Sequence, residues 1–430
     1  MAIKIKTDFP DILSALNSAE RKIIKTISKL AGHRGERVYI VGGFARDILL
    51  GFPNFDIDCV VEGDACELAG ELAKRINGAR VSLNKKFHTA KIKKGRLTID
   101  IASAREEKYA AAGELPSIRY STIKRDAARR DFTINAIYLS INRADFGKLS
   151  CKKSHLSDLK KGLIRVFHEN SFEDDPTRIF RAVRFAGRFG FRIEPFTKRC
   201  MQKALRNGML KKISSFRAKR ELMLILNEAN APEAMEKAFA AGLAGAVLPG
   251  IKKTAVKDLK TARLIWLDFF IYLQEKFDIP FYMLLALLKD LPLVKRKNIA
   301  RNLGLTKKDS SAILFSGKRL NRILRLITVN DPVWRVEADE LRHEQLLLLV
   351  LLAESKNPGA GAKTEKRVMD YILHLKRKKP FHTSLELIRM GFPNEQLGQL
   401  AKEITKHRRG GKILSKSQEY GFLVSKLEKC

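Results

Sequence analysis

The sequence has little negative charge, few cysteines and no long apolar run. Its 430 residues include 47 Asp and Glu against 83 Lys and Arg, which gives a formal net charge of +36. Such an imbalance favours a polyanionic partner, most simply a nucleic acid. The alternative is a protein that is merely very soluble or that adheres to ribosomes. The length and the 45% of hydrophobic residues predict a folded chain of two to four domains.

The five cysteines form no CxxC pair and have no histidine cluster beside them, which argues against a structural zinc site. They are Cys59, Cys66, Cys151, Cys200 and Cys430. We expect reduced thiols in a cytoplasmic protein. The longest apolar run, residues 346–353, is too short to cross a bilayer. The first ten residues lack the apolar core of a secretion signal.

Residue patterns up to about position 150 alternate between helix and strand. Amphipathic periodicity predicts helices at 11–31, 46–50 and 66–76, and β-rich runs predict strands at 38–41, 55–61, 80–92 and 97–102, with a turn at 94–96. These segments form a small α/β domain with a mixed sheet over roughly residues 30–150.

From about residue 156 the strand signals nearly vanish, and the rest reads as an all-helical extension. Helices are predicted at 174–190, 196–208, 216–228, 232–241, 256–277, 280–290, 295–303, 307–316, 319–327, 338–355, 363–376, 383–389, 394–406 and 414–428. Breaks are expected near 249–250, 357–359 and 409–411. Basic clusters recur along the extension, at 211–212, 295–297, 376–379 and 406–409, as a surface that follows a phosphate backbone would need.

The segment 174–190 predicts a helix with two distinct flanks. Asp175 is expected as the N-cap and Pro176 as the first helical residue, and Gly190 ends the helix. One flank carries Arg178, Arg181, Arg184 and Arg188, and the other carries Ile179, Ala182, Val183, Ala186 and Phe189. Such a helix packs on a core and presents guanidinium groups to an anion. The alternative is a solvated arginine face with a simple Asp175–Arg178 ion pair.

A glycine pair follows the first predicted strand. Gly42 and Gly43 allow backbone N–H groups to approach a phosphate closely, and Arg46 adds a charged donor. The alternative is an ordinary turn.

The next predicted strand carries two carboxylates. Asp56 and Asp58 point to the same side, about 6–7 Å apart along the strand. Like charges so close repel unless a cation or a proton lies between them, and Mg²⁺ prefers such hard oxygen ligands together with substrate phosphates. Asp100, on an adjacent predicted strand, is a candidate third carboxylate. The alternative is an exposed strand face.

Polar residues gather again at 129–136. Arg129, Arg130, Asp131 and Asn135 precede what reads as an apolar helix. They suit the binding of a triphosphate and a sugar, and the alternative is a helix start capped by Asp131.

Taken in order, these motifs resemble the class II nucleotidyltransferases of the polymerase-β superfamily. These are the tRNA nucleotidyltransferases, which add CCA, CC or A, and the bacterial poly(A) polymerases. The resemblance covers residues ~35–230 and rests on Val41-Gly42-Gly43-x-x-Arg46-Asp47, Asp56-x-Asp58, Arg129-Arg130-Asp131-Phe132-Thr133-x-Asn135-Ala136 and Asp175-Pro176-x-Arg178-x-x-Arg181-Ala182-x-Arg184-Phe185. One departure is Asp174 before Asp175, where the family usually has Glu.

The resemblance implies an α+β protein: a polymerase-β-like head with a mixed sheet and an elongated helical extension. We expect a catalytic head at 1–150, a neck with the base-recognition helix at 151–250, a body at 251–357 and a basic, tRNA-binding tail at 358–430. Some relatives carry a metal phosphohydrolase module. The C-terminal half lacks its clustered His-Asp pairs, so we expect no such second activity.

The resemblance also implies roles for residues. Asp56 and Asp58 would hold Mg²⁺, with Asp100 as a further catalytic candidate. The nucleotide would be bound by Gly42, Gly43, Arg46, Arg129, Arg130, Asp131, Asn135, Asp175, Arg178, Arg181 and Arg184. Within this set Asp175 and Arg178 would form an amino-acid template, which Arg181 and Arg184 would support.

The template has a chemical logic. A carboxylate accepts from the exocyclic amine of C or A, while an arginine donates to N3 of C or N1 of A. U and G present a carbonyl and an N–H at those places and are rejected.

The expected function is therefore template-independent addition of CMP, AMP or both to the tRNA 3′ end, from CTP and ATP, with release of pyrophosphate. The alternatives are a poly(A) polymerase and a non-catalytic RNA-binding protein on the same scaffold. The sequence leaves open which of CC, A or CCA is added. We expect that choice to depend on residues ~103–128, where 105–109 and 124–126 either help to switch the pocket or form a solvated loop.

Overall fold

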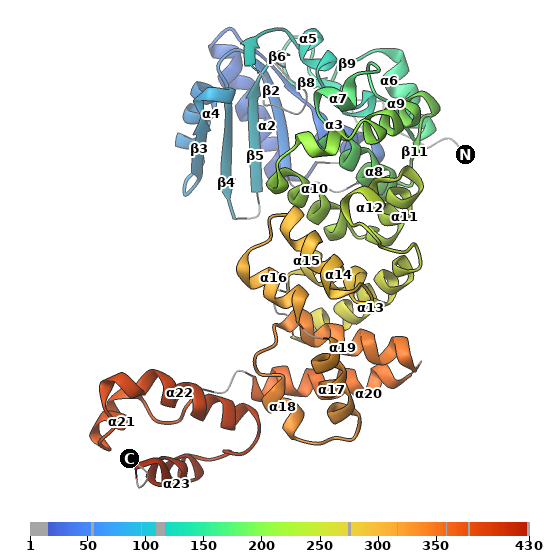
Figure 1. The fold of residues 1–430 in the computed structure, drawn as a ribbon. Coiled ribbons are helices and arrows are strands. Elements are labelled where there is room, and N and C mark those ends of the chain that lie inside the picture. The colour runs from blue at the N-terminus through green and yellow to red at the C-terminus, as the bar shows by residue number, and fades with distance from the viewer. Residues whose placement is uncertain are drawn as a thin grey trace. The chain divides into compact units, whose positions relative to one another are not determined.

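The computed structural model describes residues 16–52, 56–95, 97–108, 117–273, 277–315, 317–357, 359–376 and 379–427. The chain forms two compact units. Unit 1 comprises Met1–Ala218 and Ala240–Leu243, and unit 2 comprises Lys219–Phe239 and Ala244–Cys430. All the described strands lie in unit 1 (Figure 1). The predicted fold class, a mixed sheet followed by many helices, is confirmed. The predicted positions Phe55, Arg96, Tyr109, Pro358, Arg377, Lys378 and Cys430 lie outside the described residues.

Unit 1 alternates helices and strands from α2 to β3, and β3 to β7 then follow one another with no α-helix between them. Its strands are β1(Arg37–Ile40), β2(Asp56–Glu62), β3(Arg80–Asn84), β4(Thr89–Lys94), β5(Leu97–Ser103), β6(Arg105–Lys108), β7(Ser117–Tyr120), β8(Tyr138–Ser140), β9(Leu149–Ser150), β10(Leu163–Ile164) and β11(Arg192–Ile193). Its helices are α2(Ser18–His33), α3(Gly42–Leu50), α4(Ala65–Lys74), α5(Ile123–Ala128), α6(Lys153–Lys161), α7(Ser171–Asp174), α8(Thr177–Phe189) and α9(Pro195–Arg206), with short 3₁₀ turns at Lys85–Phe87, Thr133–Asn135 and Met209–Lys212.

Unit 2 is helical throughout its described residues. After α10(Ser215–Asn227), which begins in unit 1, come α11(Ala231–Ala241), α12(Leu243–Val247), α13(Ala255–Leu273), α14(Ile279–Leu288), α15(Leu293–Asn302), α16(Lys307–Leu314), α17(Gly317–Thr328), α18(Val333–Glu337), α19(His343–Lys356), α20(Ala360–Asp370), a π-helical turn at Tyr371–Leu375, α21(Ser384–Arg389), α22(Asn394–Arg409) and α23(Lys416–Leu427).

The main sheet has seven strands in the order β3-β4-β5-β2-β1-β8-β9. Only the β2–β5 pair is parallel, and the other neighbours are antiparallel. The parallel register places Asp58 beside Asp100. Alternate residues of β2 are fully buried, as in Ile57 and Cys59, so its carboxylates share the other face.

One predicted strand is in fact two. Residues 80–92 contain β3, a 3₁₀ turn and β4, which pair antiparallel with Arg80 opposite Lys93. The turn contains neither glycine nor proline. It is fixed by the side chain of Asn84, which accepts from the Phe87 N–H at 3.2 Å, and by His88 in the left-handed region at φ 46°. A composition-based prediction has no signal for such a turn.

Helix α3 starts earlier than predicted, at Gly42 rather than Arg46. Gly42 has φ 63°, a conformation that glycine adopts without strain, and the helix ends at Gly51 with φ 75°. The glycine pair therefore is the first turn of the helix, and its backbone N–H groups lie at the helix N-terminus.

Helix α8 confirms the predicted two-flank helix, with a shift at its start. Thr177 is its first residue and Pro176 its N-cap, while Gly190 ends it at φ 68°. Ile179, Ala182 and Val183 are fully buried, as expected for the apolar flank.

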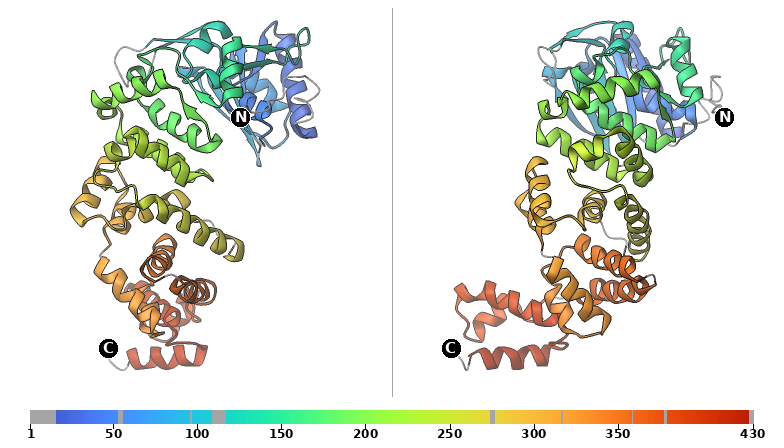
Figure 2. Two further views of the ribbon diagram at one scale, coloured as in Figure 1. Left: turned by 90° about the vertical axis from the view of Figure 1, so that its right-hand side faces the viewer. Right: turned by 45° about the vertical axis from the view of Figure 1, so that its right-hand side comes forward.

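Unit 2 follows most of the predicted helices, but α12 and α18 have no predicted counterpart. Residues 338–355, predicted as one helix, contain the turn that follows α18 and then α19. The three C-terminal helices, red in Figure 2, share a small core formed by Leu387, Phe392, Leu400, Ile404 and Leu423. Among the described helices, none combines the length and the apolar character needed to span a membrane.

Candidate functional site

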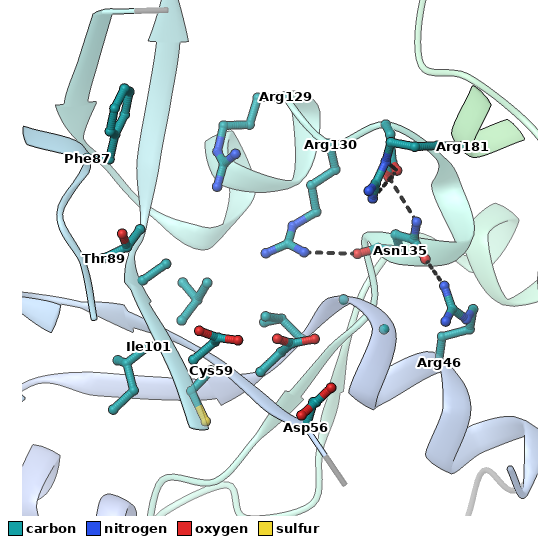
Figure 3. Close-up of a pocket in the computed structure, with 18 of the residues that line it drawn as sticks. Arg46, Asp56, Cys59, Phe87, Thr89, Ile101, Arg129, Arg130, Asn135 and Arg181 are labelled. Carbon is teal, nitrogen blue, oxygen red and sulfur yellow. Dashed lines mark hydrogen bonds and ion pairs between the residues drawn. The ribbon is translucent and has the colours of Figure 1, made fainter. Parts of the chain in front are cut away.

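Unit 1 contains a cavity of about 1120 Å³, and all fourteen residues that the sequence singled out line it. Figure 3 shows part of this lining, with Arg46, Asp56, Arg129, Arg130, Asn135 and Arg181 among the labelled residues. The fourteen residues are Gly42, Gly43, Arg46, Asp56, Asp58, Asp100, Arg129, Arg130, Asp131, Asn135, Asp175, Arg178, Arg181 and Arg184. They come from α3, β2, β5, the segment after α5, and the segment from Asp175 into α8. Residues separated by up to 142 positions in sequence therefore meet at one site.

The carboxylates stand on neighbouring strands. Asp56 is exposed and Asp58 is half-buried on β2, and Asp100 lies beside Asp58 on β5. Burial, followed by the charge of Asp100, raises the pKa of Asp58 to about 6. Asp100 Oδ2 also pairs with Lys91 Nζ at 2.7 Å. The carboxylates therefore repel each other in this site, and a bound cation would reduce that repulsion.

The donor set suits Mg²⁺ as a partly substrate-held ion. No cluster of three or more His, Cys, Asp or Glu side chains able to hold a metal occurs within the part of the chain that the structure describes. Mg²⁺ usually takes one or two protein carboxylates and fills its remaining positions with water and substrate phosphates. Asp56 and Asp58 meet that requirement, since both line the cavity.

The glycine turn lies close to the Asp58 carboxylate and to the Arg130 guanidinium. A Cβ atom on Gly42 would lie 3.2 Å from Arg130 Nη1 and 3.7 Å from Asp58 Oδ2, and one on Gly43 would lie 3.6 Å from Asp58 Oδ2. A side chain at either position would enter the space beside the carboxylate. The turn, the carboxylate and the arginine therefore form one continuous wall.

Arg46 lines the cavity but is almost fully enclosed, with 2% of its side chain exposed. Its Nε and Nη2 donate to Asp47 Oδ1 at 2.9 and 2.7 Å, and its Nη1 donates to Asn135 Oδ1 at 2.6 Å. The rings of Phe185 and Phe189 lie against its guanidinium, with centroids at 4.9 and 4.5 Å. Burial lowers its pKa. Arg46 thus ties α3 to Asn135 and to α8.

The segment 129–136 differs from its prediction in one respect. The apolar helix expected after Asp131 is absent there, because residues 133–135 form a 3₁₀ turn that leads into β8. Asp131 Oδ1 accepts from the Phe132 N–H and from Asn135 Nδ2, so the side chain stabilises this turn and not a helix. Its Oδ2 accepts from Arg181 Nε at 2.7 Å. Burial would raise the pKa of Asp131, but Arg181 and these hydrogen bonds bring it to about 2.

The start of α8 holds the predicted template pair. Asp175 Oδ1 accepts from the backbone N–H and the hydroxyl of Thr177 at 3.0 and 2.7 Å. Pro176 and not Asp175 is the N-cap of α8, so the predicted N-cap role of Asp175 is wrong, although Asp175 does bond to the first helical residue. Arg178 is 5% exposed, and it donates from Nη1 to Ser171 Oγ at 2.7 Å and from Nη2 to the Arg129 carbonyl at 2.8 Å.

Arg217 was not predicted, and it pairs with Asp175. Its Nη2 lies 2.8 Å from Asp175 Oδ1, and it lines the same cavity. The simple Asp175–Arg178 ion pair considered for this helix is therefore replaced by a pair with α10. Arg217 belongs to an ordinary amphipathic helix 42 positions away in sequence, and nothing local to it distinguishes it from its basic neighbours.

The stretches at 105–109 and 124–126 form ordered structure where they are described. Arg105–Lys108 is strand β6, paired with β7, and Asp126 lies in α5 with no exposed surface. Glu107 is 7% exposed and accepts from Arg105 and Arg129. The solvated-loop alternative is therefore wrong for Glu107 and Asp126.

Two family models match the chain. One, described as the Poly A polymerase head domain, matches residues 38–165. The other, described as the probable RNA and SrmB-binding site of polymerase A, matches residues 190–254. The first range contains the glycine turn and the three carboxylates, and the second contains Arg217.

A curated protein and two solved structures are similar over much longer ranges. The A-adding tRNA nucleotidyltransferase of Aquifex aeolicus (strain VF5) is 32% identical over 375 residues, which are 86% of this chain and 44% of that protein. The chain spans about half or less of the length of the first curated relatives that it matches.

The crystal structure of a tRNA nucleotidyltransferase complexed with a primer tRNA and an incoming ATP analog is 32% identical. It has a TM-score of 0.66, and the match covers 81% of this chain and 99% of that one. A CCA-adding enzyme in its apo form II is 29% identical, with a TM-score of 0.74 and coverage of 99% and 100%.

Proposed function

This chain belongs to the family of tRNA nucleotidyltransferases and bacterial poly(A) polymerases, and from that membership we propose that it extends the 3′ end of tRNA. The transferred groups are CMP, AMP or both, taken from CTP and ATP without a nucleic-acid template. One observation carries the proposal: a helix-terminal glycine turn, a carboxylate pair and the Asp175–Arg178 pair line a single cavity.

The proposed chemistry is a phosphoryl transfer. The tRNA 3′ hydroxyl attacks the α-phosphorus, a new P–O bond forms, the bond from that phosphorus to the β-phosphate oxygen breaks, and pyrophosphate leaves. Gly42 and Gly43 offer backbone N–H groups to the triphosphate, and Arg129 and Arg130 offer positive charge. We assign the proton of the attacking hydroxyl to Asp100, the register partner of Asp58.

Enzymes of this family generally need a divalent metal ion, and we propose that Asp56 and Asp58 hold Mg²⁺ here. When bound, Mg²⁺ supplies Lewis-acid stabilisation of the phosphate oxygens and of the leaving pyrophosphate. The raised pKa of Asp58 and the position of both carboxylates in the cavity support this assignment.

Base selection rests on Asp175 and Arg178. The contacts of Asp175 within the protein use Oδ1, so Oδ2 remains to accept from the amine of C or A. Arg178 is held by Ser171 and by the Arg129 carbonyl, and Nη2 keeps a second N–H for a ring nitrogen.

Arg181 and Arg184 support this pair from the same face of α8, while Asp131 and Asn135 bind the nucleotide near its sugar.

Outside the head, 1–150, we propose that tRNA is held by a helical neck, body and tail at 151–250, 251–357 and 358–430. Exposed lysines support this, at Lys211, Lys212, Lys295, Lys297 and Lys406. Two residues of the predicted basic clusters instead contact other parts of the protein. Arg408 is 7% exposed beneath the ring of Phe381, and Lys376 Nζ donates to the carbonyls of Asp339 and Leu341.

The test is incubation of the purified chain with tRNAs that end at N, NC and NCC, where N is the base before CCA, together with labelled CTP or ATP and Mg²⁺. Sequencing of the products then distinguishes addition of CC, A or CCA. Absence of incorporation from both nucleotides on all three tRNAs would refute the proposal.

The names of both matching family models favour a second candidate, poly(A) polymerase. Long A-tails on an unstructured RNA would support it.

A further inference from the structure

One carboxylate beside the cavity is outside every role assigned above. Asp126 lies in α5, three and four positions before Arg129 and Arg130. Its side chain has no exposed surface, and it does not line the cavity, although both arginines do. A buried charge of this kind is unfavourable unless it is fully satisfied by partners.

The partners of Asp126 are these two arginines, one tyrosine and the backbone N–H of Arg105, which donates to Oδ1 at 3.4 Å. Oδ1 accepts from Nε and Nη2 of Arg129 at 2.8 and 2.6 Å. Oδ2 accepts from Nε and Nη2 of Arg130 at 3.0 and 2.9 Å, and from the hydroxyl of Tyr138 at 2.7 Å. The Tyr138 hydroxyl also accepts from Arg130 Nε at 2.8 Å. Each guanidinium is therefore held by two N–H groups against one carboxylate, which fixes its orientation.

The remaining N–H groups of the two arginines face the cavity walls. Arg130 Nη1 donates to the Asn135 carbonyl at 3.2 Å and lies next to Gly42, and Arg129 Nη1 donates to Glu107 at 2.9 Å. Two guanidinium groups at adjacent positions repel each other, and the shared carboxylate of Asp126 reduces that repulsion. Glu107 pairs with Arg129 and also with Arg105, so the cluster of three arginines and two carboxylates has a net charge of +1. The arginine pair beside the glycine turn is therefore rigid and belongs to a net positive cluster.

We propose that Asp126 is a positioning residue for nucleotide binding, which holds Arg129 and Arg130 in one fixed arrangement against the triphosphate. This inference rests on the proposed function, because it assumes that the triphosphate lies at the glycine turn. Asp126 itself touches no substrate. Because Asp126 already orders these two long charged side chains, nucleotide binding does not have to reduce their conformational entropy.

The first test is Asp126→Asn, which keeps the shape of the side chain but removes its charge and places an amide against Arg130 or Arg129. We expect the KM for ATP and CTP to rise about tenfold, with kcat changed less than about threefold. The matched control is Glu36→Gln. Glu36 is also a largely buried carboxylate that clasps an arginine, Arg34, through two hydrogen bonds, but it does not line the cavity. The KM of Glu36→Gln for ATP and CTP should stay at the wild-type value.

A second pair of variants covers the case in which Asp126→Asn does not fold. Tyr138→Phe removes only the hydroxyl that bridges Asp126 and Arg130, and we expect KM to rise about two- to fivefold. A double variant, Arg130→Ala with Tyr138→Phe, should differ from Arg130→Ala alone by less than about twofold, since the positioned group is gone. Additive effects would indicate a role in folding only and would overturn the inference.

Nucleotide binding without turnover separates this inference from the proposed function. Calorimetric titration of wild type and variants with ATP or CTP and Mg²⁺ measures affinity when no tRNA is present. If wild type binds nucleotide but extends no tRNA, the proposed function fails and Asp126 is still tested. If Asp126→Asn, or Tyr138→Phe in its place, binds nucleotide as tightly as Glu36→Gln, the positioning role is wrong.

Discussion

Asp58 and Asp100 are register partners in the only parallel pair of the main sheet, β2 with β5. Parallel pairing places their side chains on one face, and burial together with the neighbouring charge raises the pKa of Asp58 to about 6. The folded state therefore binds this proton more tightly than the unfolded state does. Its stabilising effect is complete below about pH 4 and is lost as the pH rises through 6.

Asp58→Asn should consequently stabilise the metal-free protein while it abolishes nucleotide transfer. At pH 8 the substitution removes a destabilising charge worth about 3 kcal/mol, which we expect to raise Tm by a few degrees. The advantage should shrink towards pH 4. A thermal melt of wild type and variant in EDTA at both pH values measures it, and a lower Tm at pH 8 would contradict the proposed repulsion.

Gly42→Ala should reduce nucleotide incorporation strongly. The backbone has φ 63° at this residue, and the new Cβ would lie 3.2 Å from Arg130 Nη1. Gly70→Ala is the matched control, because Gly70 lies in α4 with nothing within 4 Å of its Cβ position. That change should leave activity intact and stabilise the helix by up to about 1 kcal/mol. Equal rates for the two variants would show that the turn does not approach the nucleotide.

Arg217→Met should weaken the choice of base more than the binding of tRNA. Without its guanidinium, Asp175 keeps only the contacts to Thr177, and the carboxylate is free to rotate. We expect the preference for CTP and ATP over UTP and GTP to fall about tenfold or more. Arg220→Met, an exposed neighbour on α10, is the control. The ratio of kcat/KM values measures the effect, and an unchanged ratio would exclude Arg217 from base selection.

The stability gap between wild type and Asp126→Asn should close in acid. Burial would raise the pKa of Asp126, but Arg130, Arg129 and Tyr138 bring it to about 2. Because this folded-state pKa lies below the unfolded value, the carboxylate stabilises the protein fully above about pH 4, and the effect disappears as the pH falls towards 2. Thermal melts of both proteins at pH 6, 4 and 2.5 test this. A gap of constant size would mean that the charge of Asp126 does not stabilise the fold.

Several elements of the candidate site could be predicted because their signals are local. The spacing of Asp56 and Asp58 on a strand determines that both face the same side, and the apolar periodicity of α8 determines which flank carries its arginines. Gly190 and Gly51 end their helices where predicted because both take positive φ. Each of these depends on a few neighbouring residues.

The differences from the predictions arise where a specific side-chain hydrogen bond, to a near or a distant residue, decides the local structure. The turn at Lys85–Phe87 depends on one Asn84 hydrogen bond, and the helix expected after Asp131 gives way to a turn because Arg181 and Asn135 hold that carboxylate. Arg46 lines the cavity, and its hydrogen bonds to Asp47 and Asn135 could not be predicted from the sequence. Partners 50 or more positions apart leave no trace in local composition.

In the proposed function, protein side chains choose which nucleotide enters a centre built on two aspartates. This choice is measured by incorporation of each of the four labelled NTPs onto tRNA ending at N, NC or NCC, by the wild-type chain with Mg²⁺. We expect incorporation of C, A or both, with U and G at least about a hundredfold slower. Comparable incorporation of all four nucleotides, or none of any, would contradict the proposed function.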